Sequence, residues 1–238
     1  MSQAILFKIP SRERPAIFEK CVRGWLARQS RSDSTHYLVS LDANDPTLPQ
    51  YRQAIKGLRH AHPRAPIDVH VGESKNKIDA VNRDLDKAPE GWSVIICGSD
   101  DMECAALRWD VTVVTLMRKH FPKLDGALHF PDGNTKDLIT FTVMGARLYR
   151  AFGYLYHPDY ASLWADNEFH DTVYAMGKVR ALSHMLARHR HCSVRGGLPK
   201  DKLYERNEAL YGADNLVYLR RKVHNFDIDR VRADLAKG

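Results

Sequence analysis

The sequence predicts an α/β fold built as a single domain, with a mixed, mostly parallel sheet and a helical C-terminal tail. Apolar segments of strand length alternate with segments of helical periodicity, which is typical of a parallel sheet with helical crossovers. Carboxylates directly follow two of the predicted strands, at Asp42 and Asp100. A chain of 238 residues is long enough for one such domain with a sizeable core, or for two small ones.

The composition excludes several classes of protein. Hydrophobic residues make up 44% and charged residues 27% of the chain, as in ordinary soluble globular proteins. No apolar run approaches the roughly 20 residues of a membrane span, and the N-terminus lacks the pattern of a signal peptide. The four cysteines are scattered without the spacing of a metal site. We therefore expect a cytoplasmic protein with free thiols and no transmembrane segment.

The net charge of +7 favours an anionic partner. A nucleotide, a nucleic acid and an acidic membrane surface all fit this charge, and charge alone does not choose among them.

The first half of the chain alternates strands with helices. The predicted strands cover residues 4–9, 36–41, 67–71 and 92–97. The predicted helices between them cover residues 16–29, 51–60 and 74–85. Ser74 is the expected N-cap of the third helix. Such an order predicts right-handed crossovers between parallel strands.

The second half is less regular. The predicted helices there cover residues 104–120, 145–152 and 164–177. The predicted strands cover residues 124–130, 138–144 and 179–186, the first two joined as a hairpin. From Ser193 the composition becomes polar, with apolar periodicity for one or two helices. We therefore expect a main domain over residues 1–192 and a helical extension over residues 193–238 that packs on it.

A basic loop is predicted after the first strand. Pro10 and Ser11 are followed by Arg12 and Arg14, and guanidinium groups match the oxygens of a diphosphate. A solvated charged turn is the alternative, above all for Arg14. Lys77, near the start of the third predicted helix, also favours a bound anion.

Asp100 and Asp101 follow the most apolar predicted strand, residues 92–97. Ligand sites of open α/β sheets lie beyond the carboxyl ends of the strands, and carboxylate oxygens suit Mg²⁺ or Mn²⁺. The alternative is that both carboxylates cap the next helix, with Glu103 in its first turn.

These features together resemble the GT-A (Rossmann-like) glycosyltransferases, especially the family 2-like inverting enzymes. The similarity covers roughly residues 5–191. The segments that carry it are residues 9–15, Asp42, residues 76–82, residues 99–101 and residues 166–168. One departure is that Ser99 stands where the family's Asp-X-Asp motif has its first carboxylate.

The resemblance implies a role for each matching residue. The residues implied to bind a nucleotide-diphospho-sugar are Pro10, Ser11, Arg12, Arg14, Asp42, Asn76, Lys77 and Asp100. Asp42 is expected near the base, and Lys77 near the ribose or phosphates. Asp101 is implied to bind Mn²⁺ or Mg²⁺ directly, and Asp100 to contact either the ribose or the water shell of the metal.

Acceptor activation and the last metal ligand are also implied by the resemblance. Asp166 is the expected catalytic base, with Glu168 second; the alternative is that Asp166 caps a helix. A late histidine often completes the metal site in this family. His191 is preferred over His189, with His184 a further candidate; the alternative is a basic surface run.

The implied activity is a metal-dependent, inverting glycosyltransferase with a UDP-linked donor. The positive charge makes DNA with a hydroxylated base a candidate acceptor. Two other functions fit the same residues. One is a nucleotidyltransferase acting on a sugar phosphate, and the other is a non-catalytic nucleic-acid-binding protein.

Overall fold

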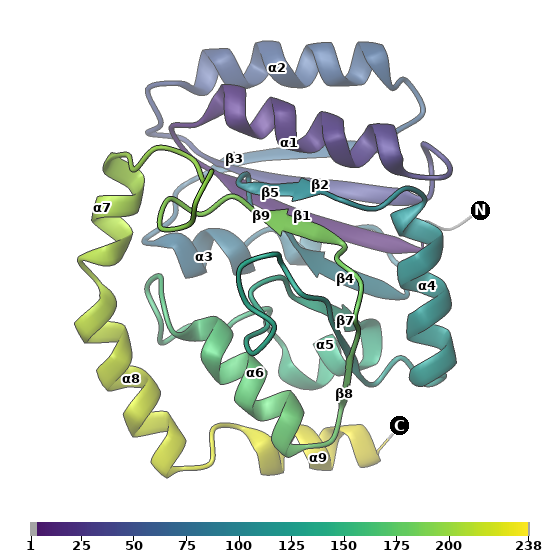
Figure 1. The fold of residues 1–238 in the computed structure, drawn as a ribbon, viewed down its shortest axis with the longest axis vertical. Helices are drawn as coiled ribbons and strands as arrows, with labels where there is room; N and C mark the ends of the chain where they lie inside the picture. Colours follow the sequence, from purple (N-terminus) through teal and green to yellow (C-terminus); the bar gives the residue numbers. More distant parts are fainter. Residues whose placement is uncertain (1–3, 238) are drawn as a thin grey trace.

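The computed structural model describes residues 4–237, which form a sheet covered by helices on both faces (Figure 1). Within this range a seven-stranded sheet has the order β3-β2-β1-β4-β7-β6-β8, and β5 and β9 form a separate two-stranded sheet. The strands are β1 (Ile5–Ser11), β2 (Thr35–Asp42), β3 (Ile67–Gly72), β4 (Val94–Cys97), β5 (Met102–Cys104), β6 (Ala127–His129), β7 (Val143–Gly145), β8 (Val179–Ala181) and β9 (Ala187–His189). Only β7 of the large sheet runs antiparallel to its neighbours, so the sheet is mixed and mostly parallel.

The helices of the main body divide between the two faces of the sheet, and three further helices follow them. They are α1 (Pro15–Arg28), α2 (Leu48–Ala61), α3 (Lys77–Asn82), α4 (Trp109–His120), α5 (Ala146–Phe152), α6 (Ala165–Ala175), α7 (Lys202–Glu208), α8 (Tyr211–Val223) and α9 (Ile228–Ala236), with a short 3₁₀ turn at Leu85–Lys87. Side chains of α1, α2 and α4 pack in one apolar core, and those of α3, α5 and α6 pack in the other. In Figure 1, α7 and α8 lie along one edge of the molecule.

Alternation along β1 explains the two cores. Phe7 packs against Trp25 of α1 and Trp109 of α4, at ring-centroid distances of 4.9 and 5.7 Å. Leu6 lies in the opposite core with Ile78 of α3. Because successive side chains of a strand point to opposite faces, one buried strand supports both helical layers.

The elements of the first half lie close to their predicted places, with three differences. One is that the segment predicted as a helix over residues 74–85 is α-helical only over Lys77–Asn82. Pro10 and Ser11 are the last residues of β1 and do not belong to the loop that follows. The helix α3 is capped by Asn76, whose Oδ1 accepts the Asp79 amide at 2.9 Å, and not by Ser74. An asparagine directly before the first helical residue is better placed to accept that amide than a serine two residues earlier.

The second half differs more. The predicted helix over residues 104–120 begins only at Trp109, because Met102–Cys104 forms β5. The expected hairpin exists as β6 and β7, but each strand is three residues long. The predicted strand over residues 179–186 ends at Ala181, and a separate strand, β9, begins at Ala187. The described part of the tail, residues 193–237, contains three helices and not the expected one or two.

Lys8 is a fully buried cation on β1. Its ammonium donates to Ser40 Oγ and, at 2.7 Å, to the carbonyl of Arg83, and Ser40 in turn donates to Asp84 Oδ2 at 2.6 Å. Burial lowers the pKa of Lys8 from 10.5 to about 8, although Asp84 opposes this shift. Charged Lys8 is therefore less stable in the folded protein than in the unfolded chain.

We expect this lysine to make the protein more stable as the pH rises. Between pH 8 and 10.5 the unfolded chain binds the proton that folded Lys8 has released, so the free energy of unfolding increases across this interval. The expected gain is about 2–3 kcal/mol. Urea unfolding of the wild type and Lys8→Met from pH 7.5 to 10 measures it, since the surface groups that titrate are common to both proteins. Parallel curves for the two proteins would contradict the prediction.

Candidate active site

A cavity of about 600 Å³ opens beyond the carboxyl ends of β1, β2 and β4. Of the residues predicted for the site, all but Glu168 and the further candidate His184 line this cavity. The residues that it gathers from the prediction are Pro10, Ser11, Arg12, Arg14, Asp42, Asn76, Lys77, Asp100, Asp101, Asp166, His189 and His191.

Strand register explains why these residues meet. Lys8 of β1 pairs with Cys97 of β4, so Ser11 and Asp100 each lie three residues further along and come together. Ser11 Oγ donates to Asp100 Oδ2 at 2.6 Å. At the turn out of β4, a Cβ on Gly98 would lie 2.2 Å from the Phe7 ring, so only glycine fits there.

The two adjacent carboxylates do not cap a helix, because α4 begins eight residues after Asp101. Asp101 accepts a hydrogen bond from the Tyr204 hydroxyl at 2.7 Å and faces His189 Nε2 at 3.4 Å. Its Oδ1 is buried without a hydrogen-bond partner among residues 4–237. Despite the burial, His189 holds the pKa of Asp101 well below its usual range. Asp101 is therefore a buried anion with one oxygen available.

His189 reaches Asp101 through the small sheet. Met102 of β5 pairs with His189 of β9, and the Arg190 amide donates to the Asp101 carbonyl at 2.8 Å. Burial alone would lower the pKa of His189, but Asp101 and Asp132 raise it to about 9. His191 lines the cavity but bonds to Ser193 at 2.8 Å, so the geometry favours His189, not the preferred His191, beside Asp101.

Asp100 has a different environment from its neighbour. Burial and the charge of Asp101 raise the pKa of Asp100 to about 6. Arg14 Nη1 lies 3.4 Å from Asp100 Oδ1 and partly offsets this effect. The surroundings of the motif thus shift its two carboxyls in opposite directions, lowering the pKa of Asp101 and raising the pKa of Asp100.

The two arginines of the basic loop form hydrogen bonds and ion pairs with other side chains of this protein. Arg14 binds Asp201 through two hydrogen bonds of 2.7 Å, and its guanidinium carbon lies 4.0 Å from the centre of the Tyr204 ring. Arg12 donates to Asp42 at 2.8 Å and to Asn44 at 2.5 Å. Both guanidinium groups line the cavity, but neither points into it without a partner.

Lys77 of α3 and Asp166 of α6 also line the cavity. Lys77 is exposed at the first residue of α3, and within residues 4–237 it makes no direct hydrogen bond or ion pair. Asp166 lies in the first turn of α6 and not at its N-cap, which is Trp164. Burial raises the pKa of the Asp166 carboxyl, although Lys77 opposes this. A carboxyl of raised basicity beside a cation suits proton transfer next to an anionic ligand.

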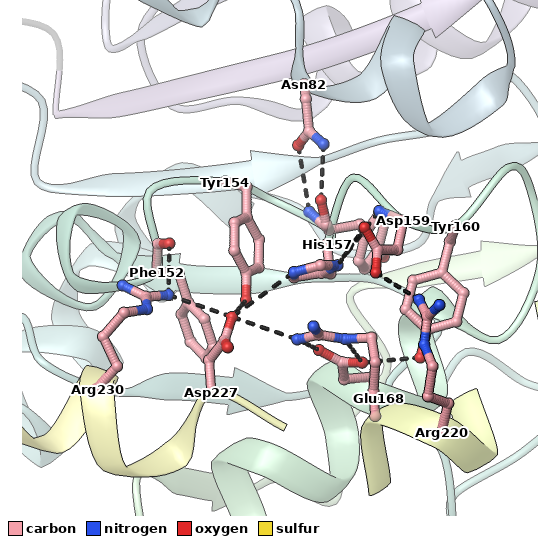
Figure 2. A network of polar contacts seen from close by, with 12 residues as sticks. Asn82, Phe152, Tyr154, His157, Asp159, Tyr160, Glu168, Arg220, Asp227 and Arg230 are labelled. Carbon is pink, nitrogen blue, oxygen red and sulfur yellow. Dashed lines mark hydrogen bonds and ion pairs between the residues drawn. The ribbon is translucent and has the colours of Figure 1, made fainter. Parts of the chain in front are cut away.

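Glu168 lies outside the cavity lining and binds the tail. Its carboxylate accepts hydrogen bonds from Arg221 at 2.7 and 2.9 Å and from Tyr160 at 2.7 Å. Figure 2 shows this network, in which Asp227 also binds Tyr154 and Arg230. Glu168 is thus committed to holding the C-terminal extension, so we do not retain it as a candidate base. His184 packs on Phe130, with ring centroids 5.3 Å apart, and does not line the cavity.

Tyr204 and Asp201 contact the site and were missing from the prediction. Both belong to the N-terminal end of α7, where Asp201 is the N-cap. The polar composition of the extension predicted only helices that pack on the body. No motif in the sequence links this segment to the carboxylates about 100 residues earlier.

A divalent cation fits the donor atoms present. Within residues 4–237 no three His, Cys, Asp or Glu side chains gather as a metal site. However, Asp101 has an unpartnered buried oxygen and faces an imidazole nitrogen. Mg²⁺ and Mn²⁺ commonly take one or two protein ligands and complete their shell with phosphate oxygens and water. Asp101 and His189 therefore fit a cation that arrives with a diphosphate.

Comparison with known proteins gives structural neighbours but no sequence match. No protein-family profile and no curated protein match the sequence. A mannosyltransferase from Pyrobaculum calidifontis, PcManGT, solved with GDP-Man and Mn²⁺, superimposes with a TM-score of 0.67 at 14% identity, covering 98% of this chain and 74% of that one. TarS 1–349 from S. aureus in complex with UDP-GlcNAc gives a TM-score of 0.59 at 12% identity, covering 88% and 66%.

A third neighbour is a different kind of enzyme. The 4-diphosphocytidyl-2C-methyl-D-erythritol synthase from Anaerococcus prevotii gives a TM-score of 0.51 at 10% identity, covering 87% of this chain and 96% of that one. Its name describes a product that carries a cytidyl diphosphate group.

No helix within residues 4–237 is both long and apolar enough to cross a membrane. The order of the sheet and the likeness to PcManGT and TarS show that the chain has the GT-A fold.

Proposed function

We propose that this protein is a metal-dependent, inverting glycosyltransferase that uses a nucleotide-diphospho-sugar. The observation that carries the proposal is Asp101, a buried carboxylate with a free oxygen and a histidine beside it, at the carboxyl ends of the strands. The structural neighbours solved with GDP-Man and with UDP-GlcNAc support it.

Different residues of the cavity would bind the base, the phosphates and the metal ion of the donor. Asp42 lies at the end of β2, and its buried Oδ1 has no hydrogen-bond partner among residues 4–237, so it can accept a hydrogen bond from a nucleobase. Lys77 can balance phosphate charge from the opposite wall. Asp101 and His189 would hold Mn²⁺ or Mg²⁺, which when bound supplies positive charge to the departing diphosphate.

We assign acceptor activation to Asp166. In an inverting transfer, the acceptor oxygen forms the new bond to the anomeric carbon while the bond to the diphosphate oxygen breaks. Asp166 would take the proton of the acceptor hydroxyl as this bond forms. Asp166 lies at the start of α6 and lines the same cavity of about 600 Å³ as Asp101.

Asp166→Asn should lower the turnover number about 10²- to 10⁴-fold, because an amide cannot accept the proton. The affinity for the donor should stay within a few-fold, since donor binding does not need this carboxylate. Steady-state kinetics and isothermal titration of the donor separate the two effects. Asn167→Ala, one residue further along α6 and outside the cavity, is the control. A full turnover number in Asp166→Asn would exclude Asp166 as the base.

We propose a UDP-linked donor. Asp42 Oδ1 can accept the imide N–H of uracil, and TarS was solved with UDP-GlcNAc. Thermal shift over a panel of UDP- and GDP-sugars, with and without Mn²⁺, tests this, because specific binding raises the apparent stability. Stabilisation by GDP-sugars alone would contradict uracil as the nucleobase of the donor.

The same incubation distinguishes the alternative activity. Release of UDP from a UDP-sugar supports glycosyl transfer. Release of pyrophosphate from a nucleoside triphosphate with a sugar phosphate would instead support a nucleotidyltransferase, the activity suggested by the third neighbour. A non-catalytic nucleic-acid-binding protein would give neither product.

For the acceptor we propose a hydroxylated base in DNA, supported by the net charge of +7. Neutralisation of phosphates predicts affinity for duplex DNA that falls steeply with salt. Binding measured between about 50 and 200 mM salt checks this. Affinity for DNA that is independent of salt, or absent, would remove DNA as the acceptor.

A further inference from the structure

Asp132 is a buried carboxylate beside the site that the sequence analysis did not single out. It lies in the segment between β6 and β7 and is 2% exposed. Its Oδ2 accepts a hydrogen bond from the Thr140 hydroxyl at 2.7 Å and lies 3.3 Å from His189 Nδ1. Its Oδ1 accepts the amides of Asn134 and Thr135, both at 2.8 Å.

The backbone of His189 is held by the same segment. The His189 amide donates to the Asp132 carbonyl at 2.9 Å, and the Asn134 side chain donates to the His189 carbonyl at 2.8 Å. His189 is therefore fixed at its ring and at both of its backbone polar groups. Its ring can reach Asp101 only through Nε2, which lies 3.4 Å from Asp101 Oδ2.

An acceptor at one nitrogen of an imidazole determines what the other nitrogen can do. A carboxylate that accepts the Nδ1 proton leaves the Nε2 lone pair for a metal ion. We propose that Asp132 is a positioning residue of the active site, which orients His189 so that Nε2 serves the cation held at Asp101. This inference rests on the proposed function and adds a residue to it.

The two oxygens of Asp132 make a selective substitution possible. In Asp132→Asn the carbonyl oxygen would keep the Oδ1 place, because two backbone amides point at it. The amide nitrogen would then face His189 Nδ1 and donate to it. This arrangement puts the ring proton on Nε2, where it opposes a cation. The variant thus keeps the acceptor for the amides of Asn134 and Thr135, while His189 loses the acceptor that holds its proton on Nδ1.

Mn²⁺ binding in the presence of UDP tests the proposal, measured by EPR of the free ion. Asp132→Asn should weaken Mn²⁺ binding about 10- to 100-fold, the usual effect of removing such a partner. Pulsed EPR should detect a directly bound imidazole nitrogen in the wild type and a weaker signal in the variant. Asp125→Asn, a partly buried carboxylate paired with Lys178 outside the cavity, is the control.

A double-mutant cycle separates positioning from loop stability. In a His189→Gln background, Asp132→Asn should cause no further loss of Mn²⁺ affinity, because its effect passes through the imidazole. An equal loss in both backgrounds, or wild-type Mn²⁺ binding by Asp132→Asn, would overturn the inference while leaving the proposed function in place. Failure of the wild type to bind Mn²⁺ with either UDP or GDP would overturn the metal role itself, and this inference with it.

Discussion

Asp101→Asn is expected to reduce metal-dependent sugar transfer at least about 1000-fold, since both charge and a ligand are lost where the diphosphate departs. Asparagine keeps the size of the side chain and can still accept the Tyr204 hydroxyl, so the fold should persist. Release of nucleoside diphosphate at saturating Mn²⁺ measures the activity, and thermal unfolding checks the fold.

The matched control for this variant is Asp86→Asn, which removes an exposed carboxylate that does not line the cavity. Its activity should equal that of the wild type. The result that contradicts the proposed function is an Asp101→Asn enzyme that retains Mn²⁺-stimulated turnover. Such an outcome would place the cation elsewhere.

Arg221→Met is expected to lower the free energy of unfolding by about 3–5 kcal/mol, the cost of leaving a buried carboxylate unpaired. Glu168 is 5% exposed and receives two hydrogen bonds from Arg221, which also lies 3.2 Å from Asp227. The substitution therefore removes the cation paired with Glu168 and one of the cations beside Asp227, at the junction between α6 and the tail. Urea unfolding followed by circular dichroism measures the loss.

The chain offers a control one residue away. Arg220 pairs with Asp159 at 2.7 Å, but both side chains are largely exposed, so Arg220→Met should cost under about 1 kcal/mol. Adding Glu168→Gln to Arg221→Met should recover much of the stability, since the buried charge is then gone. Equal losses for the two arginine variants would contradict a buried ion pair. Because Glu168 is outside the cavity, Glu168→Gln alone should affect stability and not the turnover number.

The parts of the site that follow the parallel strands β1, β2 and β4 were predictable from sequence. Each of the strands β1, β2 and β4 is recognisable by its apolar run, and the parallel register places Ser11, Asp42 and Asp100 at one edge. The rule that ligands bind beyond the carboxyl ends of such strands then locates the cavity.

The histidine partner was harder to predict because the strands that position it are short. β5 and β9 have three residues each and lie more than 80 residues apart in the chain. A three-residue strand carries too little periodicity to be recognised, and its pairing depends on tertiary contacts. Asp101 therefore appeared with three candidate histidines, and only the Met102–His189 register selects one.

Asp166 and Glu168 show a similar limit within one helix. Two residues apart on α6, they are rotated by about 200° around the helix axis. One therefore lines the cavity while the other binds Arg221. The sequence shows both carboxylates, but it does not show where the tail packs, and the tail supplies Arg221, the partner of Glu168.

Under the proposed function, the hydrogen bond from Tyr204 to Asp101 would make the C-terminal extension and the cation thermodynamically linked ligands of one carboxylate. A cation bound at Asp101 would withdraw negative charge from the carboxylate that accepts this hydrogen bond. Loading the cavity should therefore loosen α7, and anything that anchors α7 elsewhere should tighten the cavity's hold on its cation by the same factor. Faster proteolysis of residues 201–208 would then indicate that a cation occupies the site at Asp101.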